Sequence, residues 1–347
     1  MPRCPNGHEQ KVGLRCAACG QEMTYREAVN QLRALPVVQP DWGKVSVLSV
    51  GYRKLSLPVD YSGEIMIGST NAKTSSSFQV VSIRGGSWLD FLKQYVKDLR
   101  RWMELIGIEK SSNSFIVVDT TNPLCVLTIS AIPQLEHTAV IAIVADDDST
   151  PVEQNTSYVA LSLCLKKGIP VIALSETYER EMLFFTEERG FATRGDAIAR
   201  LLETLIAASD DVMDILERDQ RLGVKIHCLS AIVAASRSVY GTANNAYSAQ
   251  SYSISMGTQP TDYQTVYSLV FSDKENVAEF QKSFGSYRNK KFKGALSAEF
   301  RYKETTSPMY DMVTLYGMKG ETPLDGLREG YSAIVRSVPE LNAEGAG

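Results

Sequence analysis

The chain has 347 residues, of which 44% are hydrophobic and 22% charged, and its formal net charge is −4. This length accommodates two globular domains and a small appendage. A slightly acidic chain offers no general argument for binding nucleic acid or an acidic membrane surface, and no apolar run approaches the roughly 18 residues that a membrane span needs. The N-terminus is unlike a signal peptide, so we expect a cytoplasmic protein without a membrane span.

Four potential zinc ligands lie within the first 19 residues. Cys4 and His8 form one pair, and Cys16 and Cys19 form the second. Thiolates and imidazole are ligands that zinc prefers, and two close pairs can complete a tetrahedron. Because the protein would fill all four positions, the predicted site is structural. The stretch resembles the small zinc ribbons of many bacterial proteins, which implies a protein partner. We predict a ribbon over 1–22 and a linker helix within 23–41.

Residues 42–220 alternate apolar strands with helical patterns. Strands are expected over 44–50, 64–67, 78–83, 114–119, 138–145 and 171–174, and helices over 88–106, 151–167, 179–188 and 195–209. Continuous apolar strands separated by helices are typical of a doubly wound, mostly parallel sheet. We therefore predict an α/β domain over 42–220 that is built on such a sheet.

The strand over 114–119 ends in Asp119, and Thr120, Thr121 and Asn122 follow it. In open α/β sheets ligands bind beyond the carboxyl ends of the strands, so this loop is the first candidate for chemistry. No glycine cluster follows the strand, and no backbone cradle for phosphate is visible.

The composition changes near residue 225. A strand over 266–271, a helix over 274–284, a basic turn over 288–293 and strands over 295–302 and 312–316 predict a separate, smaller α+β domain at 221–325. The tail is 326–347. The basic turn is compatible with contact to phosphate or to an acidic partner, and equally with a solvated loop.

Taken together, residues 44–320 resemble the tubulin/FtsZ superfamily. The resemblance lies in the nucleotide-type domain, the long helix over 195–209 and the strand–helix–strand–strand order that ends in Arg-Tyr-Lys and Leu-Tyr-Gly strands. It implies a GTP- or GDP-binding protein that forms a homo-oligomer or filament. It also implies that Asp196 contacts guanine and that Asp219 is the acid that activates water on a neighbouring subunit. A solvated carboxylate at a helix end is the alternative for both.

The chain departs from this family at its phosphate loops. The family's Gly-Gly-Gly-Thr-Gly is replaced by Thr-Thr-Asn-Pro-Leu-Cys, and the first loop reads Gly-Tyr-Arg-Lys. Side chains at these positions keep backbone amides away from phosphate oxygens. We therefore expect degenerate loops and a protein that acts by assembly or partner binding. The candidate nucleotide-binding positions are Gly51, Gly85, Gly86, Thr120, Thr121, Asn122 and Asp196.

Two other functional classes remain open. In a ParA/MinD-like ATPase, 115–120 would be the Walker B strand and 68–74 the Walker A loop, although that loop lacks the second glycine of the motif and a strand pattern follows it. In a zinc-ribbon adaptor no nucleotide would bind at all. No independent catalytic set is visible, since His137 and His227 lie in apolar strand-like sequence and no nucleophile elbow occurs.

Overall fold

The structure is a computed structural model. It describes residues 44–51, 62–67, 78–81, 112–122, 137–145, 149–175, 194–235, 243–247, 263–307 and 309–320, together with positions 6, 18, 19, 37, 38, 41, 97, 100, 101, 129 and 132. For 51, 62–67, 78–81, 175, 194–198 and 234–235 it describes the backbone alone.

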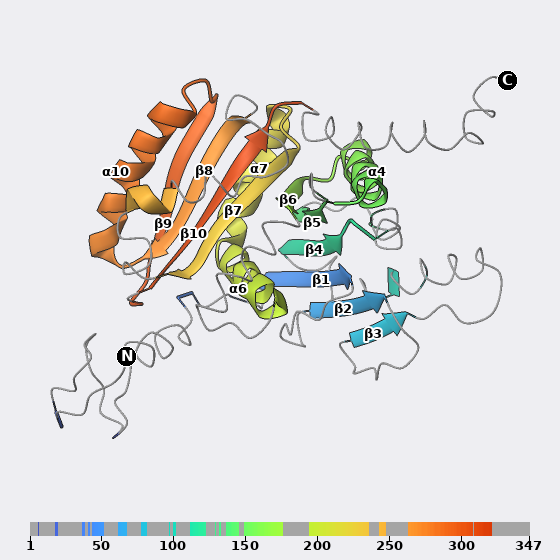
Figure 1. The fold of residues 1–347 in the computed structure, drawn as a ribbon, viewed down its shortest axis with the longest axis horizontal. Helices are drawn as coiled ribbons and strands as arrows, with labels where there is room; N and C mark the ends of the chain where they lie inside the picture. Colours follow the sequence, from blue (N-terminus) through green and yellow to red (C-terminus); the bar gives the residue numbers. More distant parts are fainter. Residues whose placement is uncertain are drawn as a thin grey trace.

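The described strands form one ten-stranded sheet with the order β3-β2-β1-β4-β5-β6-β7-β10-β8-β9 (Figure 1). Its first six strands are β1 (Val45–Gly51), β2 (Ser62–Ile67), β3 (Phe78–Val81), β4 (Asn113–Asp119), β5 (Thr138–Val144) and β6 (Val171–Ser175). All neighbouring pairs among them are parallel, as the apolar runs predict.

The sheet continues through β7 (Ile226–Ala235), β10 (Tyr310–Met318), β8 (Tyr263–Ser272) and β9 (Ser297–Glu304). β7 pairs with β6 in parallel, the pairs β7–β10 and β10–β8 are antiparallel, and β9 is parallel to β8. Helix α10 (Lys274–Lys291) connects β8 to β9 and contacts both. Figure 1 shows these four strands at an angle to the first six. The strands expected in a separate domain are thus hydrogen-bonded to the parallel sheet.

Helix α4 (Pro151–Lys167) has the bounds that the sequence predicts. Pro151 occupies its first turn, and Thr150 and Glu153 form a capping box at its start. Gly168 ends the helix with φ of 71°, a conformation that glycine adopts without a steric penalty. The signals for this helix are all local, so its bounds are readable from the sequence.

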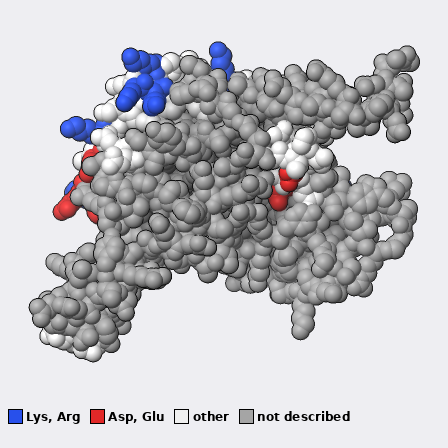
Figure 2. All heavy atoms as spheres, viewed as in Figure 1, with Lys and Arg blue, Asp and Glu red and all other residues white. Residues whose placement is uncertain are grey.

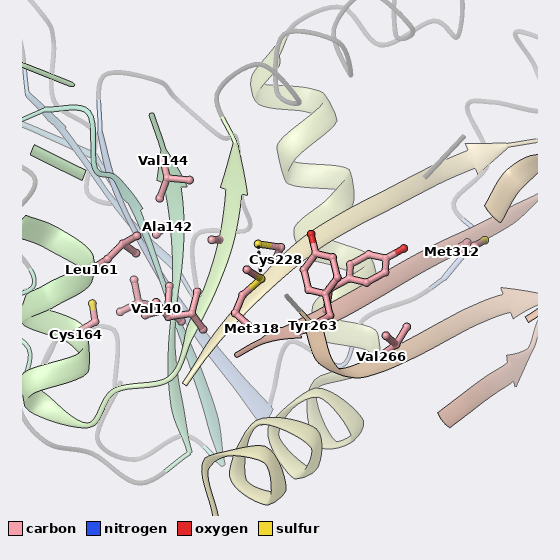
Figure 3. Close-up of a cluster of buried hydrophobic side chains, with 14 of the residues drawn as sticks. Val140, Ala142, Val144, Leu161, Cys164, Cys228, Tyr263, Val266, Met312 and Met318 are labelled. Carbon is pink, nitrogen blue, oxygen red and sulfur yellow. Dashed lines mark hydrogen bonds between the residues drawn. The ribbon is translucent and has the colours of Figure 1, made fainter. Parts of the chain in front are cut away.

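Two hydrophobic clusters cover the two faces of the sheet. Ile116 and Val118 of β4 belong to the cluster on the α4 face, whereas Phe115 and Val117 face α6 (Arg194–Ala207) and α7 (Ser209–Arg221). Residues of both halves of the sheet meet in the first cluster, where Val140 and Leu161 share one core with the residues of β7, β8 and β10 drawn in Figure 3. A strand covered on both faces has no polar side, which explains the continuous apolar runs.

Three expectations need correction. The long helix ends at Ala207, and a second helix, α7, follows after a single residue. Helix α10 extends to Lys291, so much of the expected basic turn is helical. Gly51 is the last residue of β1 and not part of a loop. Among the described helices none is long and apolar enough to cross a membrane.

Candidate functional site

Asp119, the last residue of β4, forms hydrogen bonds with the loop that follows it. Oδ1 of Asp119 accepts the backbone N–H of Thr121 at 3.1 Å and its hydroxyl at 2.7 Å. The N–H of Asn122 donates to the Asp119 carbonyl at 3.5 Å. The carboxylate at the end of this strand therefore binds the amide that follows it two residues later.

Thr120 is buried and joins three elements. Its N–H and its hydroxyl both donate to the carbonyl of Ile143 in β5, at 2.9 and 2.6 Å. The hydroxyl also lies 2.9 Å from Oγ of Ser157 in α4, and that oxygen accepts the N–H of Ala145 at 3.0 Å. Thr120 therefore holds β4, β5 and α4 together at the carboxyl end of the sheet.

The N-terminus of α4 lies beside this loop and carries its own anion. The carboxylate of Glu153 accepts the N–H of Thr150 at 2.8 Å, and the N–H of Glu153 donates to the Thr150 hydroxyl at 3.3 Å. Helix N-termini favour negative charge and often bind phosphate. Here a side chain of the same helix supplies that charge.

The structure describes some of the other candidate nucleotide-binding positions. Gly51 ends β1, the parallel neighbour of β4, so it shares the carboxyl edge of the sheet with Asp119. Asp196 lies in the first turn of α6, as predicted, and its side chain lies outside the described residues. Gly85 and Gly86 also lie outside them.

Asp219 lies in the last turn of α7 and has no exposed surface. Its Oδ2 lies 2.8 Å from Nε2 of His227 and 2.5 Å from the hydroxyl of Thr265, and its Oδ1 accepts the Tyr267 hydroxyl at 2.5 Å. Burial by itself would raise the pKa of this carboxyl, but the three hydrogen bonds together hold its pKa below the usual value. The structure thus places Asp219 in the core, between α7, β7 and β8.

Gly317 of β10 closes this cluster. A Cβ at Gly317 would lie 2.0 Å from the Thr265 hydroxyl oxygen and 3.0 Å from Oδ2 of Asp219. Only a residue without a side chain fits there. His227, which lies in apolar strand-like sequence, is fully buried. Its Nε2 is hydrogen-bonded to Asp219, and its Nδ1 has no hydrogen-bond partner among the described residues.

Helix α7 lies across the amino ends of the parallel strands. Near its start Asp210 accepts a hydrogen bond from Asn113, the first residue of β4, at 2.8 Å. Near its middle Glu217 lies 2.6 Å from Nδ1 of His137, which directly precedes β5. The sequence interpretation missed this helix, although Val212, Met213, Ile215 and Leu216 follow helical spacing.

A cavity of about 860 Å³ lies between α7 and these strand ends. It is lined by His137, Thr138, Lys167, Gly168, Ile169, Pro170, Met213, Leu216, Glu217, Gln220 and Arg221. Lys167 Nζ donates to the carbonyls of Ile129 and Ile132 at 2.9 and 2.7 Å. This cation is therefore already hydrogen-bonded to the backbone of the chain. The cavity is at the edge of the sheet opposite to Asp119.

The first turn of α7 is acidic and is tied to β9. Arg301 donates to Asp211 at 3.0 Å and to Asp214 at 2.6 Å, and Lys303 lies 3.5 Å from Asp211. Asp210 is exposed. Asp210 and Asp211 are the first carboxylates in the chain after α6. The sequence interpretation named neither of them as a functional residue.

The predicted zinc site lies mostly outside the described residues. Cys4, His8 and Cys16 are not among them, and Cys19 is exposed, with the side-chain nitrogen of Asn6 at 3.6 Å from its sulfur. Within the described part of the chain no group of three or more His, Cys, Asp or Glu residues could hold a metal ion. The zinc ribbon stays a prediction.

No protein-family model matches the sequence, and no curated protein sequence matches it. Solved structures do match. CetZ from Methanosaeta thermophila strain DSM 6194 has a TM-score of 0.59 at 12% identity, over 86% of this chain and 94% of the CetZ chain. The chain has a tubulin/FtsZ-like fold.

Two further structures support this tubulin/FtsZ-like fold. CetZ2 from Haloferax volcanii, solved as a GTPγS-bound protofilament, has a TM-score of 0.53 at 12% identity, covering 83% of this chain and 99% of CetZ2. FtsZ of M. jannaschii, solved as an empty dimer, has a TM-score of 0.51 at 10% identity, covering 81% of this chain and 91% of FtsZ. Identities this low establish the shared fold and transfer no residue role.

Proposed function

We propose that this chain is a cytoplasmic, tubulin-like assembly protein that acts as a cytoskeletal or scaffold element without ordinary GTP turnover. The fold supports the assembly, since the solved CetZ2 structure with the same fold is a protofilament. The single observation that carries the absence of turnover is the contact between Asp119 and Thr121, because it engages an amide that a phosphate loop needs.

Each described amide after β4 is already used. The N–H of Thr120 donates to Ile143, that of Thr121 to the Asp119 carboxylate, and that of Asn122 to the Asp119 carbonyl. A carboxylate at this position also repels phosphate oxygens. GTP or GDP binding would require the Asp119 carboxylate to leave its own loop, so we infer degenerate phosphate loops and at most weak nucleotide binding.

The two ends of the sheet offer surfaces for head-to-tail contact. At the carboxyl end Val152, in the first turn of α4, exposes 59% of its surface, and at the amino end Leu222, directly after α7, exposes 50%. Identical chains that join unlike surfaces form open filaments when the contact does not close a ring. We infer that Val152 and Leu222 lie in the two halves of this contact.

Analytical ultracentrifugation at micromolar protein, with and without GTP, tests the proposal. We expect self-association that GTP does not change, and a loss of association in Val152→Asp and in Leu222→Asp. Val159→Asp is the matched control, because Val159 is 40% exposed on the same helix about two turns further from the carboxyl edge. A chain that stays monomeric at all concentrations, or that assembles only with GTP and hydrolyses it, would overturn the proposal.

The zinc ribbon over 1–22 is proposed as a structural module that docks a protein partner. Cys4, His8, Cys16 and Cys19 would hold the ion, and a site closed by four protein ligands leaves no position for a reactant. In the ParA/MinD-like alternative a helix has to follow the Walker A loop. The next element described after 68–74 is strand β3, as the strand pattern predicts, so we favour the tubulin-like function.

A further inference from the structure

The end of α10 and the turn beyond it carry a group of cations. Arg288, Lys290, Lys291 and Lys293 are exposed, and none forms an ion pair with a residue that the structure describes. The Lys and Arg side chains gather over the upper end of α10 in the view of Figure 2. In contrast, Arg301 of the neighbouring strand contacts three carboxylates.

An exposed leucine stands beside these cations. Leu296 exposes 70% of its surface, more than the other large hydrophobic side chains that the structure describes. Cations in the last turn of a helix are favoured by the helix dipole, but the dipole does not account for Lys293 or Leu296, which lie beyond the helix end. Removing an aliphatic side chain from water is favourable, so a partner that covers Leu296 while it meets the four cations would gain from both contacts.

The turn is held in place and presents Leu296 outward. Phe292 is buried and its ring lies 5.6 Å from that of Tyr316. The N–H of Ala295 donates to the Phe292 carbonyl at 3.1 Å, and the N–H of Leu296 donates to the Gln264 carbonyl at 2.7 Å. Because the backbone is fixed on both sides of the turn, the exposure of Leu296 is a property of the fold.

We propose that this turn is a docking surface for an anionic lipid bilayer. The four cations meet the negatively charged headgroups, and Leu296 enters the boundary between headgroups and acyl chains. A nucleic-acid backbone would attract the same cations but offers no apolar layer for the leucine, so the combination favours the bilayer. The turn would attach the chain at the membrane surface, since a single leucine and four cations do not span it.

Co-sedimentation of the full-length protein with sucrose-loaded vesicles tests this surface. Vesicles of phosphatidylcholine with about 30% phosphatidylserine should bind the protein, pure phosphatidylcholine vesicles should not, and added salt should weaken the binding. Each lysine near an anionic surface raises partitioning by roughly fivefold, so Lys290→Glu with Lys291→Glu should lower it by about 25-fold or more. Leu296→Ser should lower it by roughly tenfold.

The matched control reverses two other exposed lysines on the same helix. The variant with Lys274→Glu and Lys282→Glu changes the net charge by the same amount, but both positions lie away from the turn. This variant should retain most of the binding to anionic vesicles. Circular dichroism checks that every variant is folded. The proposal is wrong if the wild type does not bind anionic vesicles, if the control loses as much binding as the turn variant, or if Leu296→Ser binds like wild type. It is equally wrong if a short DNA duplex binds the turn more tightly than the vesicles do.

Discussion

Asp219 and His227 form a hydrogen-bonded pair in which neither side chain has any exposed surface, with 2.8 Å between Oδ2 and Nε2. They come from consecutive elements, α7 and β7, and the chain turns between them within a few residues. Thr265 and Tyr267 of β8 complete the cluster. A carboxylate buried in this way anchors α7 to the second half of the sheet.

Replacing this carboxylate should destabilise the protein in a pH-dependent way. Asp219→Ala leaves three buried partners without their acceptor, so we expect the free energy of unfolding to fall by at least about 3 kcal/mol. The pKa of this carboxyl is lower in the folded than in the unfolded chain. Its contribution to stability is therefore complete well above about pH 4 and is lost as the pH falls through the folded-state pKa.

Urea unfolding of wild type and Asp219→Asn between about pH 7 and pH 3 measures this contribution. The difference in unfolding free energy between the two proteins should shrink on acidification. Other carboxylates titrate in both proteins and cancel in the difference. Parallel pH profiles would show that Asp219 has the same pKa in the folded and the unfolded chain.

Gly317→Ala should be among the more damaging small substitutions. The new Cβ would lie 2.0 Å from the Thr265 oxygen and 2.8 Å from Val224, so β10 or the Asp219 cluster has to move. Overpacking of this kind costs about 1–3 kcal/mol, measured as a lower denaturation midpoint. Gly285→Ala in α10 is the control: no described atom lies within 4 Å of the Cβ that it would add, and alanine should stabilise the helix by about 0.5–1 kcal/mol. Equal effects of the two substitutions would contradict the close packing at Gly317.

Two adjacent threonines should respond differently to the same change. Thr120→Val removes a buried hydroxyl that bonds Ile143 and Ser157, at a cost of about 1–3 kcal/mol in unfolding free energy. Thr121→Val removes a half-buried hydroxyl that bonds Asp119 alone among the described residues, and should cost less than about 1 kcal/mol. Chemical denaturation of both variants makes the comparison. A larger loss of unfolding free energy in Thr121→Val than in Thr120→Val would contradict the role of Thr120 in joining β4, β5 and α4.

Metal analysis tests the N-terminal prediction separately. The full-length protein should contain about one zinc per chain, and the variant with Cys16→Ser and Cys19→Ser should contain none. Cys164→Ala removes a buried thiol from α4 and should keep the metal. A chelator should then release zinc from wild type without unfolding the ten-stranded sheet. Zinc that remains bound in the double serine variant would contradict the ribbon.

The parallel half of the fold was readable because its signals lie close together in the chain. Apolar runs marked β4, β5 and β6, and the capping box with the following glycine marked both ends of α4. Helix α7 was readable too, since its apolar residues have helical spacing, but the interpretation ended the long helix near it and overlooked the second helix. The signal for this helix was present in the sequence, because the spacing of its apolar residues is a local property of the chain.

Other features depend on residues that are far apart in the chain. The sequence alone set the apolar strands, the caps of α4 and the absence of glycines directly after Asp119, since each depends on a few neighbouring residues. The tertiary structure alone decided that β7 joins the parallel sheet, that Asp219 meets Thr265 and Tyr267, which lie 46 and 48 residues further on, and that Leu296 faces outward. Burial and long-range pairing depend on how the whole chain packs, and no short stretch of sequence carries that information.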